Sequence, residues 1–117
     1  MSAKILVVDD ESDIRTYLSA VLTEHDYEVV TATDGVEALE VARRERPALI
    51  CLDLQMPNRT GTEFYKRLVR DPDLGDTPVI VVSGLSGREV AVSKPVAVFD
   101  KPIDREEFLE AVEKALA

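Results

Sequence analysis

Four short runs of consecutive apolar residues, rich in β-branched side chains, constrain the fold of this chain more than any other feature. They occupy Ile5 to Val8, Leu49 to Leu52, Val79 to Val82 and Val96 to Phe99. The apolar residues in each run are continuous rather than alternating, which is typical of strands that are covered on both faces. A weaker segment, Glu28 to Ala32, is a fifth candidate strand. The sequence thus predicts a parallel sheet between two layers of helices.

Amphipathic segments separate these strands. In the first segment, apolar residues recur at helical spacing, at Ile14, Tyr17, Leu18, Val21 and Leu22. Such spacing places a single apolar stripe on one side of a helix. Three later segments repeat the pattern around Leu39, Leu68 and Phe108. Helices that alternate with strands imply parallel pairing through right-handed crossovers, with helices on both faces of the sheet.

The expected helix starts carry a capping signal, a Ser, Thr or Asp followed three positions later by Glu. The pairs are Asp34 with Glu37, Thr60 with Glu63, Ser86 with Glu89, and Asp104 with Glu107. After Ser86 the chain has roughly two helical turns before Pro95, which cannot continue a helix. We therefore expect five strand–helix units, in which the fourth helix is short or irregular.

Length and charge restrict the class of protein. The 117 residues, of which 45% are hydrophobic, suit one domain spanning residues 1–117. The net charge of −9 disfavours direct contact with nucleic acid or with anionic membranes. The longest apolar run, Ala48 to Leu52, is far shorter than the ~20 residues of a membrane span, and no secretory signal precedes the first strand. With Cys51 as a single, buried thiol, we expect a cytoplasmic protein.

Polar residues gather where the predicted strands end. Ligands of such sheets bind outside the carboxyl ends of the strands. The residues found there are Asp9, Asp10 and Glu11 after the first strand, Asp53 after the third, Ser83 after the fourth and Lys101 after the fifth. Taken singly, each has an ordinary structural explanation, since Asp9 and Asp10 can cap a helix and Asp53 can begin a turn. Likewise, Ser83 suits a loop and Lys101 suits the surface.

Together, these residues indicate a cation site. Three carboxylates held close to one another repel unless a cation lies between them. Carboxylates without a nearby His or Cys ligand favour a hard cation such as Mg²⁺. The charges of Asp9, Asp10 and Asp53 are then balanced by Mg²⁺ and Lys101, and a neutral site of this kind can accept a phosphoryl group.

Four separated motifs follow one another along the chain. They are Val7-Val8-Asp9-Asp10-Glu11, then Leu52-Asp53-Leu54-Gln55-Met56-Pro57 with Gly61, then Ser83-Gly84, then Lys101-Pro102. In this order and spacing they closely resemble the receiver domain of two-component response regulators, over essentially the whole chain. The resemblance implies a flavodoxin-like (βα)5 sandwich, an α/β fold of three layers around a five-stranded parallel sheet with strand order 2-1-3-4-5.

The resemblance also assigns roles to residues. Asp53 matches the aspartate that accepts a phosphoryl group from a phosphohistidine of a partner histidine kinase or histidine phosphotransfer protein. Asp10 matches the direct Mg²⁺ ligand, Asp9 acts mainly through water, and the backbone carbonyl of Gln55 completes the protein ligands. The chain's single histidine, His25, is expected at the surface near a helix end and is not the phosphoryl donor.

Further roles concern the phosphorylated state. Ser83 and Lys101 would hold phosphoryl oxygens, and inward movement of the Ser83 hydroxyl would act as the switch. Gln55 and Leu85 would tune the lifetime of the aspartyl phosphate, which the domain slowly removes from itself. The resemblance therefore implies a signalling domain rather than an enzyme.

The sequence departs from the family pattern near the expected fourth helix. The spacing from Ser83 to Lys101 is about one helical turn short, and Lys94-Pro95 replaces a Gly-Ala pair. Val98 occupies the switch position that is normally Tyr or Phe, while the adjacent Phe99 faces the opposite way and is expected in the core. We therefore expect the signal to be read through Ser83 and the following loop, or by a partner that contacts the site directly.

Three other functions are compatible with parts of this pattern. A pseudo-receiver would keep the fold as an interaction module without phosphorylation. A small Mg²⁺-dependent phosphohydrolase would also use an aspartyl phosphate, but Gln55 stands where a second acid is wanted. A flavin carrier would need a phosphate-binding loop after the first strand, where Asp9-Asp10-Glu11 would repel the flavin phosphate. The sequence leaves open the partner kinase, the output, phosphorylation-dependent dimerisation, and whether the domain stands alone or forms part of a longer regulator.

Overall fold

Five strands form one parallel sheet in the computed structural model, which describes residues 3–54, 56, 60–83, 97–100 and 103–117. The strands are β1 (Lys4–Val8), β2 (Glu28–Ala32), β3 (Leu49–Leu52), β4 (Val79–Ser83) and β5 (Ala97–Asp100). Their order in the sheet is β2-β1-β3-β4-β5, and every neighbouring pair is parallel. The structure thus confirms the parallel sheet and the strand order expected from the sequence.

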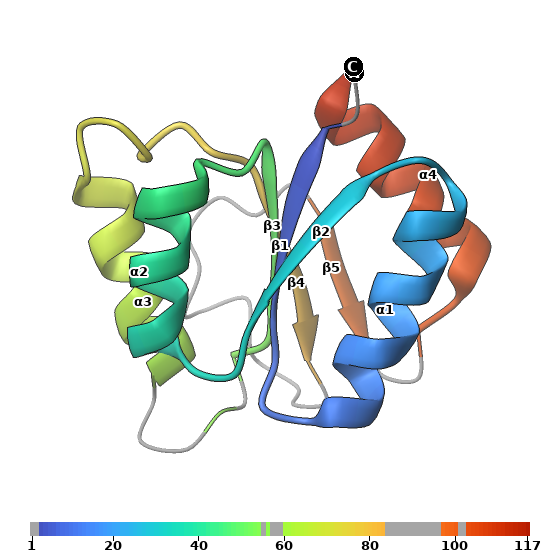
Figure 1. Ribbon diagram of the computed structural model, residues 1–117, viewed down its shortest axis with the longest axis horizontal. Coiled ribbons are helices and arrows are strands. Elements are labelled where there is room, and N and C mark those ends of the chain that lie inside the picture. The colour runs from blue at the N-terminus through green and yellow to red at the C-terminus, as the bar shows by residue number, and fades with distance from the viewer. Residues whose placement is uncertain (1–2, 55, 57–59, 84–96, 101–102) are drawn as a thin grey trace.

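Helices cover both faces of this sheet. They are α1 (Ser12–Glu24), α2 (Gly35–Glu45), α3 (Thr60–Arg70) and α4 (Arg105–Leu116). Helices α2 and α3 lie on one face, and α1 and α4 lie on the other (Figure 1). The short fourth helix expected after Ser86 falls in residues 84–96, outside the described residues, so the complete set of five strand–helix units stays a prediction.

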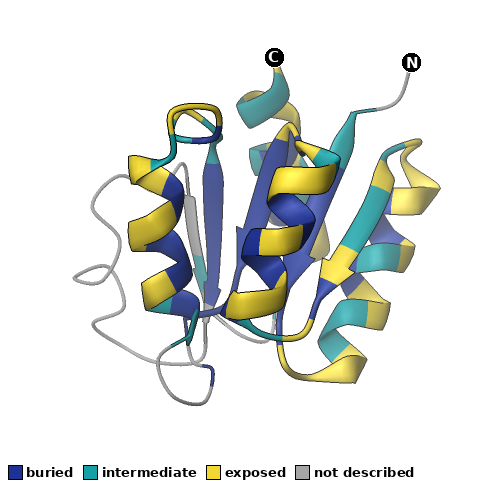
Figure 2. Cartoon of the chain, turned by 60° about the vertical axis from the view of Figure 1, so that its left-hand side comes forward, coloured by how far each residue is buried: buried dark blue, intermediate teal, exposed yellow. Residues whose placement is uncertain are grey.

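The core has two halves because successive strand residues point to opposite faces of the sheet. Leu6 and Val8 of β1 pack with α2 and α3, whereas Ile5 and Val7 pack with α1 and α4. The central strands are buried between helices whose outer surfaces are exposed (Figure 2). This burial on both faces explains why the strands read as unbroken apolar runs.

The structure confirms two of the predicted helix caps and contradicts a third. The side chains of Asp34 and Asp104 accept hydrogen bonds from Glu37 N–H and Glu107 N–H, at 2.8 and 2.9 Å. The prediction of a capping box at Thr60 is wrong. Helix α3 already begins at Thr60, and the buried Thr60 Oγ1 has no hydrogen-bond partner among the described residues. A residue with helical backbone cannot take the extended conformation that a capping side chain needs.

Three further expectations can be compared with the structure. His25 is exposed at the end of α1, with its ring Nδ1 3.0 Å from the carbonyl oxygen of Val21. Cys51 is buried, as expected. Phe99 is half-buried and packs edge-on against Phe108, with ring centroids 6.0 Å apart.

Among the described residues, no helix combines the length and apolar character needed to cross a membrane.

Candidate functional site

The carboxyl ends of β1 and β3 lie side by side in the sheet and place two aspartates next to each other. Asp9 directly follows β1, and Asp53 directly follows β3. The N–H of Asp53 donates to the carbonyl oxygen of Val8 at 2.9 Å, and the N–H of Asp9 donates to that of Ala32 at 3.2 Å. These bonds continue the hydrogen bonding of the sheet by one residue, so the backbone of both aspartates is held by the sheet.

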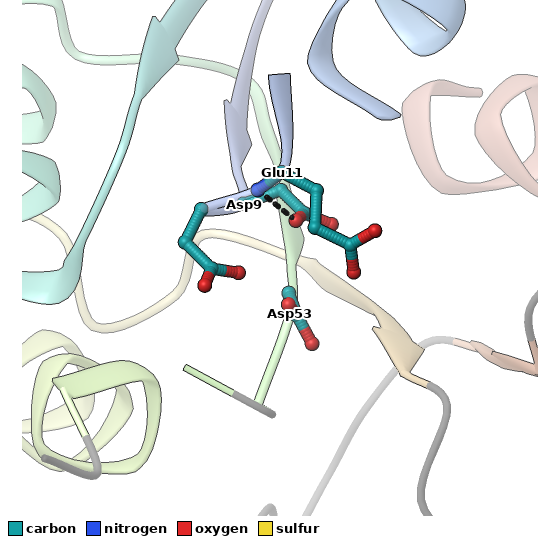
Figure 3. Close-up of side chains that lie close together, drawn as sticks. Asp9, Glu11 and Asp53 are labelled. Carbon is teal, nitrogen blue, oxygen red and sulfur yellow. Dashed lines mark hydrogen bonds between the residues drawn. The ribbon is translucent and has the colours of Figure 1, made fainter. Parts of the chain in front are cut away.

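Four carboxylates meet at this edge. Asp9, Asp10, Glu11 and Asp53 each offer one oxygen, and these oxygens all lie within 4.8 Å of one another. Asp9 and Asp53 are buried, each 1% exposed, whereas Asp10 and Glu11 are exposed. Figure 3 shows Asp9 and Glu11 at the end of β1, with Asp53 close by at the end of β3. The structure therefore brings together the three aspartates that the sequence predicted to share a site.

Two hydrogen bonds fix the turn that carries Asp9. The N–H of Glu11 donates to Asp9 Oδ1 at 2.9 Å (Figure 3), and Arg15 Nη1 donates to the carbonyl oxygen of Asp9 at 2.8 Å. The first bond sets the direction of the carboxylate, and the second ties the first turn of α1 to the end of β1. Arg15 also brings a positive charge close to a cluster of negative ones.

Two residues at the site have no role predicted from the sequence. Glu11 stands beside the aspartates in its motif, and the structure adds its carboxylate to the cluster. Gly61 is buried in the first turn of α3, where an added Cβ would come within 3.0 Å of the Asp53 carbonyl oxygen and 3.2 Å from the Cα of Leu54. Its place in the second motif is the sequence signal, but only the packing shows that α3 rests on the backbone of Asp53.

The donor set fits a hard divalent cation. The metal-ligating groups that the described part of the chain offers here are all carboxylates, without a His or Cys. Oxygen ligands of this kind suit Mg²⁺, which uses one or two carboxylates and keeps several waters. Two of the four carboxylates are buried, where mutual repulsion is less screened than in water, so a cation between them would stabilise the arrangement.

The remaining predicted site residues are described in part or not at all. The backbone of Ser83 ends β4 and pairs with Asp100, and the backbone of Val98 in β5 pairs with Val81. The side chains of Ser83 and Val98 lie outside the described residues, and so do Gln55, Leu85 and Lys101. The roles expected of these five residues therefore stay predictions.

Residues 5–113 match the family model of the response regulator receiver domain. The chain belongs to this family. It is 38% identical over 117 residues to protein Rrf1 of Nitratidesulfovibrio vulgaris. This match covers the whole chain and 85% of Rrf1. It is 35% identical over 121 residues to sporulation initiation phosphotransferase F of Bacillus subtilis, covering 99% of this chain and 95% of the relative.

Solved structures agree with this assignment. The chemotaxis protein CheY4 of Vibrio cholerae superimposes with a TM-score of 0.89 at 33% identity, covering 99% of this chain and 100% of that one. Other relatives are much longer, and the chain spans 19% of the length of two of them. The protein is thus a response regulator receiver domain of two-component signalling, with the flavodoxin-like fold of that family.

Proposed function

We propose that Asp53 accepts a phosphoryl group from a phosphohistidine on a partner histidine kinase or histidine phosphotransfer protein. The observation that carries the proposal is the position of Asp53, a buried carboxylate within 4.8 Å of three others at the carboxyl end of the sheet. A relative named as a phosphotransferase, which this receiver domain matches over almost its whole length, supports it. The family also makes a kinase or phosphotransfer protein the expected partner.

In the transfer, a carboxylate oxygen of Asp53 forms a bond to phosphorus while the bond from phosphorus to the donor histidine nitrogen breaks. The histidine takes up a proton and leaves as neutral imidazole. Transfer of this kind depends mainly on positioning and charge, and the backbone hydrogen bond from Asp53 to Val8 supports the proposal by fixing the backbone of Asp53. Burial keeps bulk water away from the Asp53 carboxylate.

The cofactor proposed is Mg²⁺. Asp10 and Asp53 would bind it directly, with the backbone carbonyl of Gln55, while Asp9, oriented by the Glu11 N–H, would hold one of its waters. When bound, Mg²⁺ supplies positive charge that offsets the carboxylates and the incoming phosphoryl oxygens. The role of Asp9 and Asp10 would be to hold this positive charge beside Asp53, because their own carboxylates repel a phosphoryl group.

Regulation would pass through residues near the phosphoryl group. Ser83 and Lys101 would hold its oxygens, and the shift of Ser83 with the following loop would change partner binding. Val98 lacks the aromatic ring of the usual switch, so the signal would not depend on that position. Gln55 and Leu85 would set the rate of slow self-dephosphorylation, which makes the protein a timed signalling domain rather than an enzyme.

The proposal also covers the extent of the domain, its location in the cell and its partners. Residues 1–117 would form a single receiver domain of a cytoplasmic protein that contacts neither nucleic acid nor membrane itself. Its downstream partner is an output protein or an output domain of a longer regulator.

The test is phosphorylation by acetyl phosphate in the presence of Mg²⁺, followed by intact-protein mass spectrometry. We expect a labile adduct of one phosphoryl group that needs Mg²⁺ and is absent from Asp53→Asn. Asp73→Asn, an exposed aspartate remote from the carboxylate cluster, is the matched control and should be phosphorylated like the wild type. An absent adduct together with absent Mg²⁺ binding would instead favour a pseudo-receiver that acts only as an interaction module.

A further inference from the structure

Helices α2 and α3 come into backbone contact at their first turns, at the same end of the molecule as the carboxylate cluster. An added Cβ on Gly35, the first residue of α2, would lie well within 3.0 Å of the carbonyl oxygen of Thr60, and real Cβ atoms essentially never approach so closely. Gly35 is buried and Thr60 is half-buried. A side chain at Gly35 therefore requires the first turns of α2 and α3 to move apart.

Thr60 leads directly to Gly61, which makes the second contact. An added Cβ on Gly61 would likewise fall within 3.0 Å of the carbonyl oxygen of Asp53. The first turn of α3 thus lies between α2 and the backbone of the phosphoryl acceptor. Both contacts are to backbone atoms, which cannot rotate away as the end of a flexible side chain can.

Two side-chain hydrogen bonds hold the first turn of α2 in the described part of the chain. The Asp34 side chain accepts from Glu37 N–H at 2.8 Å, and the Glu37 side chain accepts from Thr33 N–H at 2.6 Å. These bonds join α2 to the end of β2. The hydroxyl of Thr60, in contrast, has no hydrogen-bond partner among the described residues. Crowding at Gly35 therefore acts against a held first turn of α2, and we expect it to be transmitted to the first turn of α3.

From these contacts we infer that Gly35 is a positioning residue for Asp53, acting through Thr60 and Gly61. The inference rests on the proposed function. The close approach of α2 allows α3 to rest on the Asp53 backbone, while the sheet holds Asp53 from the other side through Val8. Asp53 is thus placed between two backbone contacts, and a shift of α3 removes one of them.

Gly35→Ala tests the inference, with Gly75→Ala as a milder control for crowding at a glycine outside the proposed link. Gly75 lies beyond the far end of α3, and its added Cβ would lie 3.0 Å from the carbonyl oxygens of Asp71 and Val69. Both substitutions crowd a glycine against backbone, but only Gly35 is linked to the carboxylate cluster. The readouts are Mg²⁺ affinity by calorimetry and the rate of adduct formation with acetyl phosphate, both measured well below the unfolding temperature of each variant.

We expect Gly35→Ala to weaken Mg²⁺ affinity about tenfold and to slow phosphorylation by at least that factor, because small displacements of ligand-bearing groups have effects of this order. Gly75→Ala should lower the unfolding temperature yet leave both readouts within about twofold of the wild type. Equal readouts for the two variants would overturn the inference. Failure of the wild type to bind Mg²⁺ and accept a phosphoryl group would instead overturn the proposed function.

A second measurement on the wild type applies if Gly35→Ala does not fold. Coupling between two sites is reciprocal, so occupancy of the carboxylate cluster must stabilise the contact at Gly35. Amide hydrogen exchange at Glu37, in the first turn of α2, should slow when Mg²⁺ and acetyl phosphate are added, and it should slow by a larger factor than exchange at Gly75, which reports only the general stabilisation of the fold. Unchanged exchange at Glu37 in protein shown by mass to be phosphorylated would contradict the role of Gly35.

Discussion

At the scale of single residues, Asp26 and Arg46 have the left-handed backbone conformation although neither is glycine. Their φ angles are 67° and 47°. Arg46 ends α2, and its N–H donates to the carbonyl oxygen of Ala42 at 2.9 Å. Side chains other than glycine pay a steric cost in this conformation, which is why glycine is common just beyond helices.

Arg46→Gly should therefore stabilise the protein. Relief of the left-handed strain is expected to raise the free energy of unfolding by about 0.5 to 1 kcal/mol. The ion pair of Arg46 with Asp73, at 3.5 Å and largely exposed, contributes little. Arg46→Ala is the control, because it removes the ion pair without relieving the strain. This account would be contradicted if urea unfolding gave Arg46→Gly no higher free energy of unfolding than Arg46→Ala.

Cys51 is a residue whose titration is linked to folding. Complete burial in β3 raises the pKa of the Cys51 thiol to about 12. In the unfolded chain the thiol ionises near its ordinary pKa of 9.0. Its contribution to stability is therefore complete below pH 9 and is lost as the pH rises towards 12, because the unfolded chain releases a proton that the folded protein keeps.

The predicted effect is a decline in the free energy of unfolding above pH 9, of up to about 1.4 kcal/mol per pH unit from this group. Other groups also titrate in this range, so the quantity to compare is the difference between the wild type and Cys51→Ala. Although Cys51→Ala is less stable at neutral pH, the gap between the two proteins should narrow from pH 9 to pH 11. A gap that stays constant would show that the thiol does not ionise on unfolding.

At the scale of secondary-structure elements, the first turns of α2 and α3 differ in how their polar groups are satisfied. Both begin with the same type of sequence signal, Asp34 with Glu37 and Thr60 with Glu63. Only Asp34 makes the capping bond. The buried hydroxyl of Thr60 lacks a partner among the described residues, and an unsatisfied buried polar group is destabilising.

Opposite effects are expected when these two side chains are replaced. Asp34→Ala should lower the free energy of unfolding by about 1 kcal/mol through loss of the cap. Thr60→Val keeps the shape of the side chain and removes the unsatisfied hydroxyl, so it should be neutral or stabilise by up to about 1 kcal/mol. Both are measured by chemical denaturation. A loss of stability in Thr60→Val similar to that in Asp34→Ala would mean that Thr60 does cap α3.

The strands show why so much of the fold can be predicted from the sequence. Because β1, β3 and β4 are buried on both faces, their apolar runs are unbroken, and their ends place Asp9 and Asp53 without further information. The contacts of Gly35 and Gly61 could not be predicted in this way. The contact of Gly35 depends on how closely α2 approaches α3, and the contact of Gly61 depends on how α3 packs on the chain after β3. A glycine carries no side chain whose chemistry would indicate such a role.

At the scale of the whole molecule, negative charge is in excess over the chain and is also concentrated at one site. The chain carries a net charge of −9, and four of its carboxylates converge at one edge of the sheet. Like charges held together oppose the compact state, most strongly where water screens them least. Any cation that binds only the folded protein must therefore stabilise it, by an amount that depends on its concentration and affinity.

Mg²⁺ should therefore raise the unfolding temperature of this receiver domain. At a Mg²⁺ concentration a hundred times the dissociation constant, the expected stabilisation is about 2.7 kcal/mol, or on the order of 10 °C. Chelation with EDTA should reverse it. NaCl at equal ionic strength is one control, because it screens the net charge without occupying the site, and Asp53→Asn is another, because it removes one carboxylate from the cluster. The same rise in NaCl, or in Asp53→Asn, would show that Mg²⁺ acts by screening the surface charge and not by binding among Asp9, Asp10 and Asp53.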